Sequence, residues 1–221
     1  PPAVPNYTPP EGLKFNADEA KKLLAAAGFP NGQGLPKITI FGNTSETSAE
    51  DVNRWRWVAD QWKKNLGAEV EVDTSMTSTQ LLDARKNQKG FQCEIRGWIN
   101  IQETPELLSE VFRTNSPYMK DVFDWGAPVE AKTYNGVTYD PAADAKKFDE
   151  LVNQADVEQD PQKRNDLYRQ CEELVLRNAV YVPLGNFVSL QLVKPQVKGL
   201  QWGAYHYLFP EQIGKDVVIT K

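Results

Sequence analysis

The chain has 221 residues, of which 40% are hydrophobic and 25% charged, and this ordinary globular composition argues against disorder. Its net charge of -5 is mild and not clustered, so a nucleic-acid partner is not expected. No stretch approaches the roughly 18 apolar residues of a membrane span. Because the chain begins on Pro1 and carries no signal peptide, we expect a processed or truncated piece from which any export signal is missing.

The first segment, residues 1–14, holds five of the 15 prolines and is predicted to be an extended lead-in without a core of its own. Asn16 is expected to cap the first helix, with Glu19 as its capping-box partner, and Gly28 to end it. The inward face of this helix would carry Ala20, Leu23, Leu24 and Ala27. A loop follows whose glycines match no phosphate-binding fingerprint, and residues 37–41 are then predicted as a strand.

A second helix is predicted between Ser48, its N-cap, and Gly67, which ends it. Its apolar stripe is spaced for a helix and consists of Val52, Trp55, Ala59, Trp62 and Leu66. Trp57 lies on the opposite side, where it is either packed against a neighbouring loop or exposed at an interface. A strand at Val70 and Val72 and a short helix over residues 79–87 follow.

The stretch from Phe91 to Leu108 carries the main functional prediction. It begins as an alternating strand that ends at Gly97-Trp98, after which Thr104 and Pro105 open a helix. The order to this point is β-α-β-α-β, which is typical of a sheet with crossover helices. Open α/β sheets place ligands at the carboxyl ends of their strands, although a buried core tryptophan would fit the same pattern.

The second half of the chain begins with a predicted β-hairpin over residues 132–139, with Asn-Gly in its turn. Two helices follow, opened by Asp140-Pro141 and by Asp160-Pro161. The first is expected to bury Phe148, Leu151, Val152 and Ala155, and the second Leu167, Cys171, Leu174 and Val175. Strands are predicted at residues 180–184 and 188–193, before a polar tail.

The residues that enzymes and metal sites need are scarce. The only histidine, His206, lies in an aromatic tail, so neither a nucleophilic triad nor a His/Cys metal site is expected, and no cofactor is implied. A carboxylate pair such as Glu94 with Glu103 leaves a glycosidase open, but such residues are usually surface charges. Cys93 and Cys171 are expected to be buried free thiols, with a disulfide as the alternative. We therefore expect a protein that is not an enzyme.

The residues suited to noncovalent binding lie where strands are predicted to end. They are Trp98, Asn100, Gln102 and Glu103 after one strand, Asn43, Thr44 and Ser45 after another, and Arg85 at the end of a helix. If the sheet is parallel, these segments converge on one edge of it. An aromatic face with amide groups and one arginine suits a polar organic ligand such as a peptide or a sugar.

A family resemblance runs through nearly the whole chain, from YTPP at 7–10 to KPQVKGL at 194–200. The stretches that carry it are ADEAKKLLAAAGFP (17–30), NTSE (43–46), WKKNLGAEVEV (62–72), LLDAR (81–85), RGW (96–98), DPQKRNDLYRQCEELVLRNAVYVPL (160–184) and LVKP (192–195). In their order and spacing, the chain resembles the C-terminal lobe of the oligopeptide/dipeptide-binding class of ABC-transporter substrate-binding proteins.

The resemblance implies an α/β lobe of the type II periplasmic-binding-protein fold, with a central mixed β-sheet flanked by helices. Residues 1–14 would then lead in from the inter-lobe region, and residues 15–221 would form the C-terminal ligand-binding lobe, with an inserted hairpin at about 130–140. The resemblance also implies solute capture outside the cytoplasm, in the periplasm or on a lipid anchor. The partners would be the missing N-terminal lobe and an ABC-transporter permease.

The family's site residues are matched only in part. Trp98, after Gly97, matches the tryptophan that lines the family's ligand cleft, and Arg85 matches an arginine that meets a ligand carboxylate. Peptide binders of the family typically carry an aspartate three residues after that tryptophan, where this chain has Ile101, and some carry an arginine at the position of Ile95. Loss of a buried charge partner is costly, so the alternative to a peptide is an oligosaccharide or another uncharged solute.

Overall fold

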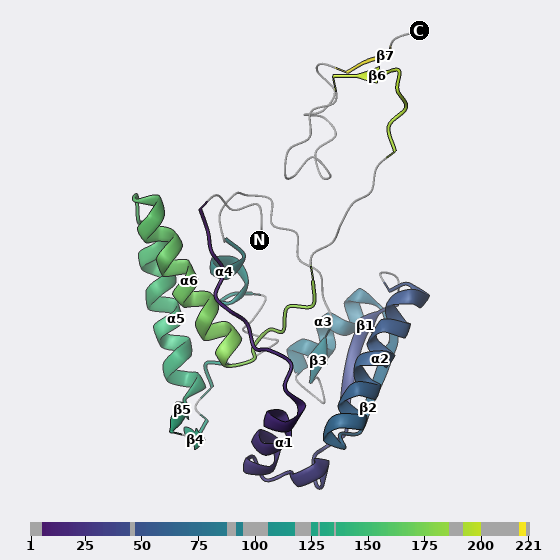
Figure 1. Cartoon of the computed structure of the whole chain (residues 1–221), viewed down its shortest axis with the longest axis vertical. Coiled ribbons are helices and arrows are strands. Elements are labelled where there is room, and N and C mark those ends of the chain that lie inside the picture. The colour runs from purple at the N-terminus through teal and green to yellow at the C-terminus, as the bar shows by residue number, and fades with distance from the viewer. Residues whose placement is uncertain are drawn as a thin grey trace.

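A computed structural model describes residues 6–44, 47–87, 92–94, 106–117, 125–127, 129–134, 136–185, 192–199 and 217–219. Within these residues the elements form an α/β group, from residue 17 to residue 94, and a helical group, from residue 106 to residue 177 (Figure 1). A short strand pair lies beyond both groups. No helix in the described part is long and apolar enough to cross a membrane.

A parallel three-stranded sheet in the order β2-β1-β3 forms the centre of the α/β group. Its strands are β1 (Ile38–Asn43), β2 (Val70–Met76) and β3 (Cys93–Glu94). β1 begins opposite Val70 of β2, and its buried residues Ile40 and Phe41 pair with the two residues of β3. The predicted β-α-β-α-β order is therefore confirmed, with β1 and β2 running a few residues further than predicted.

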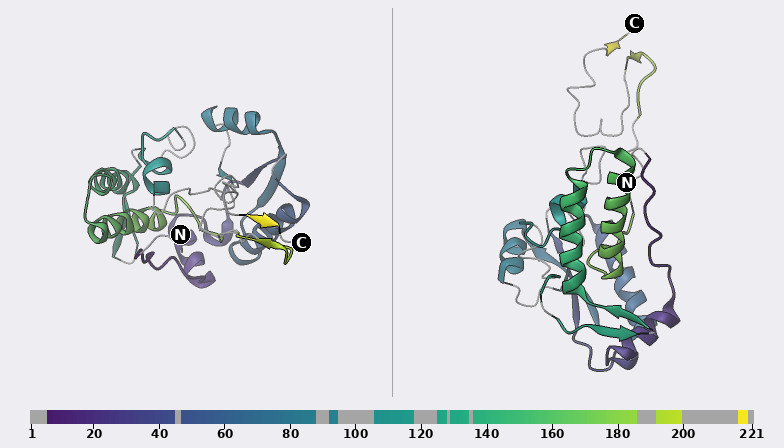
Figure 2. Two further views of the ribbon diagram at one scale, coloured as in Figure 1. Left: turned by 90° about the horizontal axis from the view of Figure 1, so that it is seen from above. Right: turned by 90° about the vertical axis from the view of Figure 1, so that its left-hand side faces the viewer.

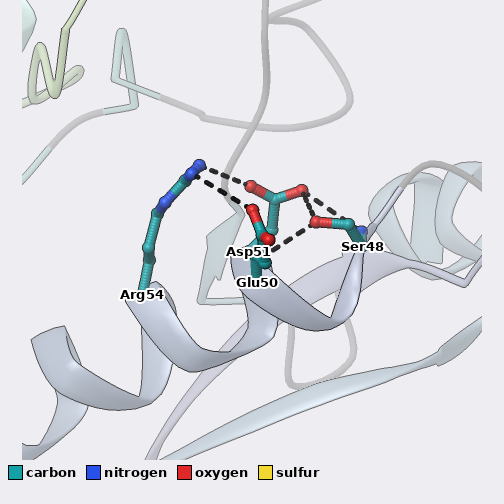
Figure 3. A network of polar contacts seen from close by, with 4 residues as sticks. All are labelled: Ser48, Glu50, Asp51 and Arg54. Atoms are coloured by element: carbon teal, nitrogen blue, oxygen red, sulfur yellow. Dashed lines mark hydrogen bonds and ion pairs between the residues drawn. The ribbon is translucent and has the colours of Figure 1, made fainter.

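Helices α2 (Ala49–Leu66) and α3 (Ser78–Asn87) connect these strands. The chain moves from β1 outward to β2 and then back across to β3, so right-handed crossovers place the two helices on opposite faces, as Figure 2 shows. A capping box holds the start of α2: Ser48 Oγ accepts the N–H of Asp51, whose side chain accepts the N–H of Ser48 (Figure 3). Arg54 Nη1 lies 2.8 Å from Asp51 Oδ1, and Arg54 Nη2 lies 3.9 Å from Glu50 Oε2.

The predicted stripe of α2 faces the sheet. Trp55 and Ala59 are buried, and the other three members of the stripe are partly covered. Trp57, on the opposite side, is 64% exposed, in line with the exposed-aromatic alternative. Gly67 ends the helix in the left-handed conformation, with φ 70°, as predicted.

Helix α1 (Ala17–Ala26) is capped by Asn16, whose side chain accepts the N–H of Glu19 at 3.0 Å. It contacts α2 and the short 3-10 helix η1 (Pro30–Gly32), but none of its residues is buried and Leu23 is 40% exposed. The predicted inward face is therefore only half covered. The physical reason is that its main neighbours, α2 and η1, cover only part of its apolar face.

The helical group consists of α4 (Glu106–Val111), α5 (Pro141–Ala155) and α6 (Pro161–Arg177). A β-hairpin of β4 (Lys132–Tyr134) and β5 (Val137–Tyr139) comes directly before α5 in the chain. Asp140 and Asp160 cap α5 and α6, as predicted. The core holds Leu108, Phe112, Trp125, Ala145, Phe148, Leu151, Val152, Ala155, Tyr168, Cys171, Leu174 and Val175. Every predicted inward residue of the two helices is buried except Leu167, which is partly covered; Asn165 and Tyr168 are buried without having been predicted.

Polar contacts tie this group together and to the lead-in. Asp144, 8% exposed, accepts hydrogen bonds from Arg177 at 2.5 Å and Asn178 at 2.8 Å, which fixes the end of α6 against the start of α5. The Tyr7 hydroxyl donates to Glu172 of α6, and the Tyr7 ring packs against the helical core. The lead-in then continues from α6 to α1 (Figure 1).

The two strands predicted after α6 are not found in the described residues. Residues 181–185 form no strand, and Val182 and Leu184 are 63% and 67% exposed. Of residues 188–193 only the last two are described, and they too are outside any strand. β-branched residues favour a strand only where a neighbouring strand takes their backbone hydrogen bonds, and the described part offers none here. The last elements are β6 (Val197–Lys198) and β7 (Val218–Ile219), which pair antiparallel.

Candidate functional site

The carboxyl edge of the parallel sheet is the place where the sequence predicts a ligand. β1 ends there at Asn43, and β2 ends there at Met76 and is followed at once by α3. The pairing of β1 with β2 shifts register between Phe41 and Asn43, so β2 carries one extra residue at this edge. Such irregularities bend a strand end and redirect its side chains.

Asn43 is held at this edge by contacts to the start of α3. Its side-chain Nδ2 donates to the hydroxyl of Ser78, the first residue of α3, and the next backbone N–H, that of Thr44, donates to the Met76 carbonyl at 2.9 Å. The end of β1 is therefore anchored across the bulge of β2. Ser78, which has no distinctive sequence signal, was not among the predicted site residues.

The amino end of α3 has its own cap. Thr77 Oγ1 accepts the N–H of Gln80 at 3.3 Å, and Gln80 Oε1 accepts the N–H of Thr77 at 2.9 Å. This arrangement is a capping box, with the positive end of the helix dipole at the carboxyl edge of the sheet. An edge with such a dipole, an amide and hydroxyl groups can hydrogen-bond a polar solute.

The carboxylate of Asp73 lies on β2, three residues before the strand ends at Met76. Asp73 Oδ1 accepts the N–H of Ser75 at 2.8 Å and its hydroxyl at 2.7 Å. These hydrogen bonds stabilise the carboxylate and hold the pKa of Asp73 below its usual value. No group of side chains that could hold a metal ion is found among the described residues.

The predicted site residues are placed only in part. Asn43 lies at the edge, whereas Ser45, Gly97, Trp98, Asn100, Gln102 and Glu103 lie outside the described residues. Arg85 is in the last turn of α3, seven residues after Ser78, so its backbone lies about 10 Å along the helix from the Asn43 contact. The described backbone therefore does not bring Arg85 and Asn43 together.

The cysteines lie in different groups of elements. Cys93 is half-buried in β3 and Cys171 is fully buried in α6, and both are free thiols, as expected. Burial raises the pKa of both thiols, that of Cys171 to about 12. Neither thiol is activated as a nucleophile.

Residues 1–120 match the family model described as bacterial extracellular solute-binding proteins, family 5 Middle. The periplasmic oligopeptide-binding protein OppA of Salmonella typhimurium is 29% identical over 194 residues, which make up 86% of this chain and 31% of that relative. The periplasmic murein peptide-binding protein MppA of Escherichia coli is 26% identical over 181 residues, 82% of this chain and 29% of its own. The probable deoxycholate-binding periplasmic protein YgiS of Escherichia coli is 27% identical over 228 residues, covering 97% and 36%.

Solved structures agree on the fold. The unliganded open form of MppA, a periplasmic murein tripeptide-binding protein, superposes with a TM-score of 0.68 at 23% identity, covering 90% of this chain and 35% of that one. A periplasmic oligopeptide-binding protein of Borrelia burgdorferi superposes with a TM-score of 0.59 at 24% identity, covering 80% of this chain and 31% of that one. The expected type II periplasmic-binding-protein fold is confirmed. This chain spans about a third of the length of these relatives, and it belongs to the family 5 bacterial extracellular solute-binding proteins.

Proposed function

We propose that this chain is a ligand-binding lobe of an extracytoplasmic protein that captures an oligopeptide-like solute for an ABC importer. The observation that carries the proposal is the family match over residues 1–120, which takes in the whole α/β group and its carboxyl edge. Two of the relatives described above are named for binding oligopeptides or murein peptides in the periplasm. The proposed role is binding and release, without catalysis, in the periplasm or on a lipid anchor.

Exposed apolar residues support the proposal that this is one lobe of two. Leu13 of the lead-in is 84% exposed and Phe15, at the start of the lobe, is 88% exposed; Val182, Leu184 and Leu192 are also largely exposed. Such exposed apolar side chains would be removed from water if a second lobe packs against them. The proposed domain organisation therefore keeps residues 1–14 as a lead-in, 15–221 as the lobe and the hairpin of β4 and β5 as an insertion.

The ligand is proposed to bind at the carboxyl edge of the sheet. β3 runs parallel to β1, so the chain that leaves β3 heads for the edge that holds Asn43. We propose that this continuation supplies Gly97, Trp98, Asn100, Gln102 and Glu103, with Ser45 following β1. Trp98 would form an apolar wall, and Arg85 would meet a ligand carboxylate only if its side chain reaches from the far end of α3.

A peptide is the ligand class that the relatives support, and none of those described above is named for a sugar. The relatives therefore favour a peptide over an oligosaccharide. Ile101 offers no carboxylate for a peptide's α-amino group, so we propose recognition that depends little on that group. YgiS is named as a probable deoxycholate-binding protein, and deoxycholate has no amino group, which supports this part of the proposal.

Calorimetry on the full-length protein tests the proposal, with a panel of short peptides in free and N-acetylated forms. We expect binding of peptides, with little loss on acetylation because no carboxylate stands at Ile101. A protein that binds no peptide but binds oligosaccharides would contradict the proposed ligand class. A large loss on acetylation would contradict the proposed role of Ile101.

A further inference from the structure

Gln92, the residue directly before β3, has a side chain that bonds to the backbone of β1. Its Oε1 accepts the N–H of Thr39 at 2.7 Å, and its Nε2 donates to the carbonyl of Lys37 at 2.9 Å. A primary amide carries the same donor and acceptor as a peptide group. The Gln92 side chain therefore hydrogen-bonds two backbone groups of β1 in the way that the backbone of a partner strand would.

These two backbone groups belong to the side of β1 that faces β3. The N–H of Ile38 donates to the Glu69 carbonyl, toward β2, and successive residues of a strand turn their backbone groups to opposite sides. Lys37 and Thr39 therefore face β3. The contact extends the β1–β3 ladder toward its amino end, beyond the pairs Ile40↔Cys93 and Phe41↔Glu94.

The contact matters because β3 is very short. Of the described residues, only Cys93 and Glu94 of β3 pair with β1, and a ladder of two pairs specifies its register weakly. A slip of one residue would turn Cys93 and Glu94 to the opposite faces, and a slip of two would move the chain by about 6.6 Å along β1. Either slip would displace everything that follows β3.

We propose that Gln92 is a positioning residue, whose side-chain amide holds β3 in register against β1 and so sets where the chain leaves the sheet toward Trp98. The effect on ligand binding rests on the proposed function, whereas the effect on β3 does not. Neither the residue type of Gln92 nor its spacing in the sequence predicts this role, because the role depends on which backbone groups of β1 lie opposite the side chain.

The free cysteines Cys93 and Cys171 make the role measurable in the full-length protein. Cys93, next to Gln92, is half-buried, and we expect it to react faster with a thiol reagent when β3 detaches. Cys171, fully buried in the helical group, reacts only when that group opens. Labelling under native conditions, with each cysteine assigned by mass spectrometry, therefore separates local detachment of β3 from general unfolding.

The experiment compares wild type with Gln92→Ala, Gln92→Asn and a control, Gln154→Ala, at an exposed glutamine of α5. Gln92→Ala loses both hydrogen bonds and is expected to label about tenfold faster at Cys93, with no change at Cys171. Gln92→Asn keeps the amide on a shorter stem that does not span both groups, so it should resemble Gln92→Ala. Gln154→Ala should match wild type.

An unchanged Cys93 rate in Gln92→Ala overturns the proposal, and so does an equal rise at both cysteines, which would indicate general destabilisation. A second arm measures peptide affinity of the full-length protein by calorimetry, where Gln92→Ala is expected to bind about tenfold more weakly. Faster labelling with unchanged peptide affinity overturns the link to the site. If the wild-type protein binds no peptide, the proposed function fails, and the labelling result still decides the role of Gln92 in β3.

Discussion

Trp55 of α2 lies directly against Gly42 of β1. A Cβ atom placed on Gly42 would lie 2.2 Å from Cζ3 and 2.6 Å from Cη2 of the Trp55 ring, well inside van der Waals contact. The strand next to the proposed site therefore accepts a buried indole only because residue 42 has no side chain. This contact couples the packing of α2 to the end of β1, where Asn43 stands.

Gly42→Ala is expected to destabilise the chain by about 1–3 kcal/mol, because the added methyl group forces the buried ring of Trp55 to move. Urea unfolding followed by far-UV circular dichroism measures the loss. Gly12→Ala is the matched control, since a Cβ at Gly12 meets nothing within 4 Å. Equal stability of the two variants would contradict the proposed steric cause.

Tyr7→Phe is expected to reduce the free energy of unfolding by about 1–2 kcal/mol, because it removes the hydroxyl that donates to Glu172 and keeps the ring. Burial and this hydrogen bond raise the pKa of the Tyr7 hydroxyl, so the contact is present throughout the neutral range. Urea unfolding followed by far-UV circular dichroism measures the loss.

Tyr139→Phe is the control for that variant, at a partly covered tyrosine of β5. It should leave the unfolding midpoint nearly unchanged. If Tyr7→Phe is as stable as the control, the hydroxyl contact does not anchor the lead-in to α6.

Alkaline pH is expected to destabilise the helical group through Cys171. Burial, and then the charge of Asp156, raise the pKa of its thiol from 9.0 to about 12. Between these values the unfolded chain loses a proton that the folded chain keeps, so the stability from this group is complete below pH 9 and falls as pH rises toward 12. The contribution to the slope is about 1.4 kcal/mol per pH unit.

Cys171→Ala should therefore flatten the decline of stability over this alkaline range, whatever its effect at neutral pH. Urea unfolding at several alkaline pH values measures the slope. Cys93→Ala, at a half-buried thiol whose pKa is raised less, should change the slope less. Identical slopes for Cys171→Ala and wild type would show that the thiol is not protected from ionisation.

Trp98→Ala is expected to weaken ligand binding by the full-length protein by about 1–3 kcal/mol, through loss of stacking and apolar burial. Calorimetry with the tightest-binding peptide of the panel measures the change. Trp57→Ala removes a 64% exposed tryptophan from α2 and should leave affinity unchanged. Equal affinities of wild type and Trp98→Ala would contradict a role for Trp98 in ligand binding and favour a core aromatic instead.

Much of the local structure follows from the sequence, because its signals are short-range. Asp140 and Asp160 cap their helices as predicted, and the spacing of Phe148 and Val152 shows which face of α5 is buried. Ser48 and Gly67 mark both ends of α2. Caps and helical periodicity act within a few residues, so they can be read without knowing what lies across the fold.

The errors fall where a partner had to be supplied from elsewhere in the chain. Val182 and Leu184 have strand-forming neighbours in sequence, but no strand lies beside them in the described part. Leu23 has the spacing of an inward residue, but the main neighbours of α1, α2 and η1, leave it 40% exposed. For the candidate site, Asn43 was predicted at a strand end, whereas its anchor Ser78 and the role of Gln92 were not.

The sequence by itself determined both ends of α2, the starts of α5 and α6, the alternation of strands and helices from β1 to β3 and the family to which the chain belongs, since all of these rest on local pattern and order. Only the tertiary structure decided that Gly42 must lack a side chain, that Ser78 holds Asn43 and that Gln92 completes the edge of β1. Each of these depends on groups that lie 13 to 55 residues apart. No local sequence pattern specifies contacts between groups so far apart in the chain, because these contacts are set by strand register and by the packing of helices on the sheet.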